Sequence, residues 1–170
     1  SVKTTKHTYL LCDADEELQR LKELLEKSEK FCFDTETTSI NSLNCDIVGL
    51  SFSVKPHEAY YIPFRAGDYE GSRRRLSIFA DLFASNRMKI GQNLKYDIEV
   101  LSLYGIEVEG PMFDTMIAHF LLYPGQMHNM DHMAEIMLRY KTIHIDELIG
   151  KGSKQKSMAD VEINFIKEYA

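Results

Sequence analysis

The segment Phe31-Cys32-Phe33-Asp34-Thr35-Glu36-Thr37 decides how this sequence folds. Phe31–Phe33 is typical of a buried strand, and it leads directly into the acidic residues Asp34 and Glu36. In an extended chain residues i and i+2 point to the same side, so we expect both carboxylates at one spot. Two like charges so close raise each other's pKa unless a cation lies between them. The ordinary alternative is that the strand ends at Phe33 and polar loop residues begin.

The neighbouring segments predict further strands around this one. Thr8–Cys12 is typical of a short strand, and Asp13 can cap a helix that runs to about Lys30. Ile47–Val54 alternates apolar with other residues, Lys55–Glu58 is a turn, and Ala59–Phe64 returns as a β-branched and aromatic strand. With the central segment, these predict a three-stranded antiparallel meander.

After residue 64 the pattern changes to helices and one short strand, Met88–Gly91. The helices that we expect are Ser72–Asn86, Asn93–Tyr104, Phe113–Leu122, Met130–Tyr140 and Ala159–Tyr169. Gly105–Pro111 is a connector, Tyr123–Gly125 a helix breaker, and Gly150–Ser157 a loop. This order predicts an α/β fold, in which a mixed sheet of an antiparallel meander plus parallel strands is flanked by α-helices. No internal boundary is visible, so residues 1–170 are expected to form a single domain.

Composition limits the class of protein. The 170 residues are 44% hydrophobic and 27% charged, which is ordinary for one globular domain. No run approaches the roughly 18–20 apolar residues of a membrane span, so no membrane partner is expected. Three cysteines without close spacing suit reduced thiols, and we expect a cytoplasmic protein. The net charge of −6 does not exclude nucleic acid, because bound cations reverse the field of a carboxylate site.

A second acidic feature is Asp97 in the segment Gly91–Asp97, GQNLKYD. Asn93 can begin a helix whose inward stripe is Leu94, Ile98 and Leu101. Asp97 then lies at the edge of that stripe, where an ionised carboxylate is costly unless it is paired or binds a metal. The Asn93 amide, four residues earlier, is expected to hold Asp97 or a substrate phosphate. The alternative is an aspartate hydrogen-bonded to a local lysine or amide.

Several short segments follow one another from about residue 30 to the end: Phe33–Ile40 (FDTETTSI), Ile47–Phe52 (IVGLSF), Tyr61–Pro63 (YIP), Gly91–Asp97 (GQNLKYD), Tyr104–Glu107 (YGIE), Phe113–Met116 (FDTM), Lys141–Ile143 (KTI) and Gly150–Gly152 (GKG). In this order they resemble the proofreading 3′-5′ exonuclease domain of bacterial DNA polymerase I, a ribonuclease H-like exonuclease. Either carboxylate motif alone is a weak signal. Together with the segments between them they are specific.

The resemblance implies four acidic ligands and two divalent metal ions, Mg²⁺ or Mn²⁺. Asp34 would bridge both metals, Glu36 would bind the first, and Asp97 would serve the second. Two metals roughly 3.5–4 Å apart assist both sides of an in-line phosphodiester displacement. Tyr169 matches the family tyrosine that orients the attacking water, and the fourth acidic ligand would follow it by four residues. Because the sequence ends at Ala170, we expect a domain truncated within its last catalytic motif, with weak metal occupancy and little activity.

The resemblance also implies contacts with a DNA 3′ end, whose last nucleotide must be splayed out to reach the metals. The residues concerned are Thr35, Ile40, Gln92, Asn93, Tyr96 and His128. Ile40 would wedge beside the last base. Candidates for additional phosphate contacts are Lys151, Lys154 and Lys156. The implied partners are a polymerase domain, and possibly a 5′ nuclease domain, in the same full-length chain.

Four other residues have ordinary interpretations. His128 and His132 have the spacing of a zinc pair, but no third ligand accompanies them. We expect His132 on a helix surface, and His128 toward the substrate. Asp114 and Asp131 lie near helix starts and are expected to act as capping or first-turn residues.

The sequence therefore predicts a hydrolase that removes nucleotides one at a time from a DNA 3′ end, as the editing module of DNA polymerase I. One alternative is a catalytically weakened or inactive DNA-binding or scaffold domain. The presence of Asp34, Glu36 and Asp97 argues against it. The other alternative is an RNA-processing exonuclease of the same fold, which the resemblance of Gly91–Asp97 and Lys141–Ile143 disfavours.

Overall fold

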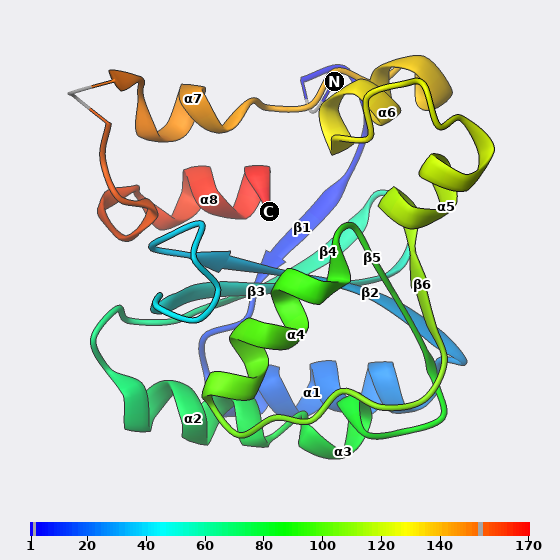
Figure 1. Ribbon diagram of the computed structural model, residues 1–170. Coiled ribbons are helices and arrows are strands. Elements are labelled where there is room, and N and C mark those ends of the chain that lie inside the picture. Colours follow the sequence, from blue (N-terminus) through cyan, green and yellow to red (C-terminus); the bar gives the residue numbers. More distant parts are fainter. Residues whose placement is uncertain (2, 153–154) are drawn as a thin grey trace.

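A computed structural model describes residues 1, 3–152 and 155–170, so that Lys154 lies outside the described residues. Within them, six strands form one mixed sheet in the order β1-β4-β3-β2-β5-β6 (Figure 1). The strands are β1 (Thr8–Leu11), β2 (Lys30–Thr37), β3 (Ile47–Lys55), β4 (Glu58–Pro63), β5 (Met88–Gly91) and β6 (Met112–Asp114). β2, β3 and β4 are the antiparallel meander, while β1, β5 and β6 pair parallel with their neighbours. The predicted mixed sheet is confirmed.

The helices cover both faces of this sheet (Figure 1). They are α1 (Asp15–Glu26), α2 (Tyr69–Ser77), α3 (Ala80–Phe83), α4 (Leu94–Leu103), α5 (Thr115–Leu122), α6 (Met130–Leu138), α7 (Ile145–Ile149) and α8 (Ile163–Tyr169), with a 3₁₀ turn at Met158–Asp160. Helices α1 to α4 pack on one face, and α7 and α8 on the other. No helix in the described ranges has both the length and the apolar character needed to cross a membrane.

The larger core lies between the sheet and helices α1 to α4. Its centre is aromatic: it contains Phe31, Phe33, Phe52 and Phe83, and the centroids of neighbouring rings are 5.1 to 6.3 Å apart. A smaller core on the opposite face joins Val48 and Tyr61 to the helices that follow residue 144. Central strand β2 is therefore packed from one side and partly open on the other.

Several predicted boundaries were wrong. The alternative that a loop begins after Phe33 fails, because β2 continues to Thr37. The helix predicted at Ser72–Asn86 is two helices, α2 and α3, because the chain turns at Phe79 and packs its ring 5.2 Å from that of Phe52.

Local interactions also moved the ends of other helices. Helix α1 ends at Glu26, before Lys30, because Lys30 already belongs to β2. Helix α6 ends at Leu138, where Arg139 takes the left-handed conformation (φ 52°). The helix predicted at Ala159–Tyr169 is a 3₁₀ turn followed by α8.

Two elements were missed. Met112–Asp114 is strand β6, so the helix expected from Phe113 begins only at Thr115. β6 is a strand because Ile90 and Gly91 of β5 pair with Phe113 and Asp114. Helix α7 was not predicted; the side chain of His144 accepts a hydrogen bond from the Asp146 N–H at its start.

Candidate active site

The acidic pair lies on the open face of the central strand. Phe31 and Phe33 point into the larger core, whereas Asp34 and Glu36 point to the opposite side, where they line a cleft of about 370 Å³ with Tyr169. Opposite them on β3 are Ser51 and Gly49. The prediction that both carboxylates share one face of a strand is confirmed.

Asp97 reaches the same strand from α4. It is 2% exposed, and its Oδ1 accepts hydrogen bonds from the Thr35 backbone N–H (2.9 Å) and the Thr35 hydroxyl (2.6 Å). The expectation that Asn93 holds Asp97 was wrong. Asn93 has a left-handed backbone (φ 61°), and its N–H donates to Asp114 Oδ1 at 3.2 Å. Thr35, which lies between the two acidic residues of β2, thus joins Asp97 to them.

Burial shifts the pKa values of all three carboxyls upward, and repulsion from neighbouring carboxylates adds to this effect. Burial raises the pKa of Asp34 to about 8, and the charge of Asp97 adds to this effect. Burial also raises the pKa of Glu36 well above its usual range, with contributions from Asp34 and Asp97. For Asp97 the pKa rises to about 6, since burial outweighs the opposing hydrogen bonds from Thr35. The three groups are therefore neighbours whose ionisation a bound cation would favour.

The donor chemistry fits a hard divalent cation. Carboxylate oxygens are the ligands that Mg²⁺ and Mn²⁺ prefer. In the described part of the chain, no residue donates a hydrogen bond to the side chain of Asp34 or Glu36, although Glu36 is only 7% exposed. No three His, Cys, Asp or Glu side chains among the described residues are placed to hold one metal ion between them. The carboxylates thus face an open cleft and do not form a closed cage.

Tyr169 forms part of the opposite wall of this cleft. Burial raises the pKa of its phenol far above the ordinary value, and the charges of Glu36 and Asp34 add to this effect. The hydroxyl therefore stays protonated and can donate a hydrogen bond. Helix α8, which carries Tyr169, is held by Ile166 in the smaller core and by a 3.0 Å contact between Glu168 and His7.

Of the six predicted substrate residues, Gln92 lines the cleft. Its Nε2 donates to the backbone carbonyl of His128 at 2.7 Å, and its Oε1 accepts from the Thr115 hydroxyl. The structure thus brings Gln92 and His128 together. The Nδ1 of His128 also lies 2.7 Å from Nδ1 of His119, a buried residue that spacing arguments missed.

The other predicted contacts lie outside the walls of the cleft. Tyr96 donates to the Ser39 carbonyl at 2.5 Å and is hydrogen-bonded to the Thr37 hydroxyl. This anchors the turn that carries Ile40, which is 98% exposed. Asn93 is an exposed residue at the start of α4. Thr35 is buried and bound to Asp97.

A profile of the 3′-5′ exonuclease family matches residues 9–170. The chain belongs to this family. Its relatives include DNA polymerase I of Pseudomonas aeruginosa, 37% identical over 156 residues that cover 86% of this chain and 17% of the relative. DNA polymerase I of Borreliella burgdorferi is 34% identical over 156 residues, which cover 91% of this chain and 17% of that relative. The chain therefore spans about 17% of the length of these curated relatives.

Several solved structures share the fold of this chain. NrnC of Brucella melitensis with bound Mg²⁺ superposes with a TM-score of 0.70 at 18% identity, covering 97% of this chain and 73% of that one. The catalytic core of RRP6 from Trypanosoma brucei gives a TM-score of 0.70 at 15% identity, covering 98% of this chain and 45% of that one. The POL domain of Pol1 from M. smegmatis in complex with DNA primer-template and dNTP gives a TM-score of 0.63 at 18% identity, covering 78% of this chain and 23% of that one. The predicted ribonuclease H-like fold is confirmed.

The cleft has further wall residues that sequence reasoning did not place there. Asp131 lies on the wall formed by α6 and the following segment, and it accepts a 2.5 Å hydrogen bond from Thr142. It is a first-turn residue of α6, as expected, but the cap is Asn129, whose Oδ1 accepts from the His132 N–H. No sequence spacing relates Thr142 to the acidic pair, so only the folded chain reveals this wall.

Proposed function

We propose that residues 1–170 form a two-metal 3′-5′ exonuclease that releases nucleotides one at a time from a DNA 3′ end. In this proposal the domain is the proofreading part of a DNA polymerase I in a bacterial cytoplasm. The observation that carries it is the meeting of Asp34, Glu36 and Asp97, three carboxylates with raised pKa values, beside a cleft in a member of the 3′-5′ exonuclease family.

The carboxylates would hold two Mg²⁺ or Mn²⁺ ions. Such ions supply a nucleophilic hydroxide and stabilise charge on the leaving oxygen. Asp34 and Glu36 supply carboxylate oxygens to which no described residue donates a hydrogen bond. Thr35 fixes the orientation of Asp97 through two hydrogen bonds. The protein thus contributes charge from β2 and a rigidly placed third carboxylate from α4.

Tyr169 and Gln92 would position the reactants. The protonated Tyr169 hydroxyl lies near the acidic pair, where it can orient the attacking water. Gln92 is held at both ends of its amide, by Thr115 and by the His128 carbonyl, so it presents a fixed polar edge to the cleft. This arrangement supports a role in placing the terminal nucleotide.

DNA is the favoured substrate because relatives with 34–37% identity are DNA polymerases I. The likeness to NrnC and RRP6, at 15–18% identity, extends to the fold alone. A scaffold role is disfavoured because a domain without chemistry gains nothing from burying three carboxylates that repel one another.

The test is release of mononucleotides from 3′-labelled single-stranded DNA in Mg²⁺, with the chain extended past residue 170 and with residues 1–170 alone. Asp34→Ala should lower the rate by more than about 100-fold, since even outer-shell partners of a metal are worth about 10–100-fold. Tyr169→Phe should lower the rate while leaving DNA affinity unchanged. Asp81→Asn on the far helix α3 is the control. An unchanged rate in Asp34→Ala would refute the assignment, and faster cleavage of an RNA strand would favour the RNA-processing alternative.

A further inference from the structure

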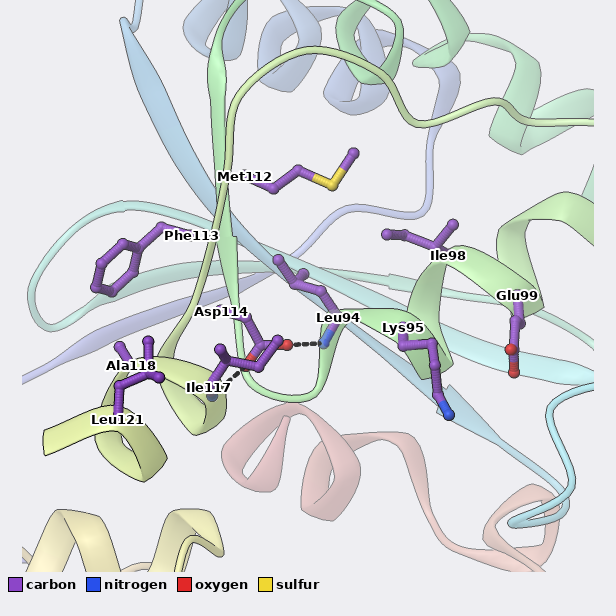
Figure 2. Close-up of a pocket in the computed structure, with 10 residues that line it drawn as sticks. All are labelled: Leu94, Lys95, Ile98, Glu99, Met112, Phe113, Asp114, Ile117, Ala118 and Leu121. Atoms are coloured by element: carbon purple, nitrogen blue, oxygen red, sulfur yellow. Dashed lines mark hydrogen bonds between the residues drawn. The ribbon is translucent and has the colours of Figure 1, made fainter. Parts of the chain in front are cut away.

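A second hollow, separate from the cleft, lies between α4, β6 and α5 (Figure 2). It has a volume of about 650 Å³. Its apolar lining consists of Leu94, Ile98, Met112, Phe113, Ile117, Ala118 and Leu121. We call it the α4–α5 groove. The proposed exonuclease chemistry does not use it.

Helix α5 is far more exposed than its sequence, TMIAHFLL, would favour. Ile117 is 59% and Leu121 73% exposed on the groove side, and Phe120 and Leu122 are exposed as well. Within α5 the buried residue is His119. A helix that is apolar all round is normally buried, and a large exposed apolar patch marks an interaction site.

The groove also borders an open edge of the sheet. β6 is the last strand in the sheet order, and within the described ranges no strand pairs with its outer edge. Met112 and Phe113 on this strand are exposed apolar residues. Native proteins cover or charge such edges, because bare ones invite aggregation. Helix α5 and strand β6, which border the groove, therefore both have apolar surfaces that no described part of the chain covers.

We propose that the α4–α5 groove is the docking surface for the polymerase part of the same chain, through an apolar segment that places an acidic side chain opposite Lys95. This inference rests on the proposed place of the domain in a DNA polymerase I. The relatives carry some five times more chain than this segment, since it covers 17% of their length. That remainder is tethered to the domain, so its effective concentration at the groove is high.

The charge at the rim of the groove indicates the kind of segment that binds there. Lys95 lies at the rim, exposed and without an ion-pair partner among the described residues, whereas its neighbour Glu99 accepts a hydrogen bond from Ser42. An acidic group is therefore the natural complement. A second copy of this chain fits less well, because each copy carries a net charge of −6.

Docking at the groove would also steady the helix that carries Asp97. The Asp114 carboxylate accepts hydrogen bonds from the backbone N–H groups of Leu94 (2.8 Å) and Ile117 (3.2 Å), drawn as dashed lines in Figure 2. One side chain thus caps both α4 and α5 at the base of the groove. A segment packed on Leu94 and Ile117 would hold these two helix starts together.

The experiment is the rate of maleimide labelling of Leu121→Cys in residues 1–170 and in the full-length polymerase chain, read by mass spectrometry of the labelled peptide. Leu43→Cys is the matched control, because Leu43 is 69% exposed and does not line the groove. Labelling of Leu121→Cys should slow by about tenfold or more in the full-length chain, since covered sites react only through local opening. Leu43→Cys should change by less than about twofold.

Equal labelling of Leu121→Cys in both chains would overturn the proposal. So would protection already present in a chain extended only about 30 residues past residue 170, or protection of residues 1–170 that grows with concentration and so reveals a second copy. Adding Lys95→Glu should restore labelling in the full-length chain, and no change would refute the acidic partner. Exonuclease assays on the same proteins separate the two proposals: loss of protection with intact DNA cleavage rejects only the docking surface.

Discussion

Replacing Asp34 with asparagine should make the metal-free protein less sensitive to pH. Asparagine keeps the shape of the side chain but cannot ionise. In the wild-type protein, burial and the charge of Asp97 raise the pKa of Asp34 to about 8. An unfolded aspartate has a pKa of about 3.9. Between these values the folded chain keeps a proton that the unfolded chain has released.

The sign follows from this difference in bound protons. Stability from the protonated Asp34 is fully present below about pH 4 and is lost as the pH rises through the folded pKa. One proton changes the free energy of unfolding by about 1.4 kcal/mol per pH unit, hence by about 3 kcal/mol from pH 5 to 7. For a chain of this size that is a fall in melting temperature of roughly 5–10 °C. In Asp34→Asn the loss of stability between pH 5 and 7 should be smaller than in the wild type by up to about 3 kcal/mol.

The assay is urea unfolding in EDTA at pH 5, 6 and 7, followed by circular dichroism. Asp81→Asn, on an exposed position of α3, is the matched control and should follow the wild type. Mg²⁺ should flatten the wild-type profile, because a cation favours the ionised carboxylates, and should have less effect on Asp34→Asn. If wild type and Asp34→Asn lose the same stability within about 0.5 kcal/mol, the reasoning about this carboxylate is wrong.

Two further substitutions test the supports of the site. Thr35→Val removes the hydroxyl that donates to Asp97 and should lower the free energy of unfolding by about 1–3 kcal/mol and weaken Mg²⁺ binding; an unaltered Mg²⁺ titration would count against that role. Gly49→Ala should cost about 1–3 kcal/mol by urea unfolding, because its methyl group would overlap the Tyr61 phenol. Gly125→Ala, where a methyl group meets nothing within 4 Å, should leave stability unchanged, and equal costs would refute the packing explanation.

The parts of the fold that depend on local patterns could be predicted. β5 has the predicted bounds Met88–Gly91, and β3 and β4 follow the alternation and turn residues around Lys55–Glu58. The missed parts depend on distant partners. Three residues at Met112–Asp114 become a strand only because β5 lies beside them. The break near Phe79 follows from packing on Phe52, which no local signal reveals.

The same distinction holds for the site. The shared face of Asp34 and Glu36 follows from strand geometry alone. The support of Asp97 does not, because it depends on how α4 packs against β2 and brings Thr35, 62 residues away in sequence, within hydrogen-bonding distance. Helix periodicity predicted that the Asn93 amide holds Asp97. Instead, Asn93 has a left-handed backbone, and its N–H donates a hydrogen bond to Asp114.

The cross-strand partners of the acidic pair explain why a cleft opens over this part of the sheet. Residues directly opposite each other on antiparallel strands share a face, and here Ser51 and Gly49 stand opposite Asp34 and Glu36. Because these partners are small, little covers the carboxylates from β3. The phenol of Tyr61 lies against Gly49 and donates a 3.1 Å hydrogen bond to the Val48 carbonyl. A larger residue at position 49 would therefore disturb both the packing and the space in which we propose that the metals bind.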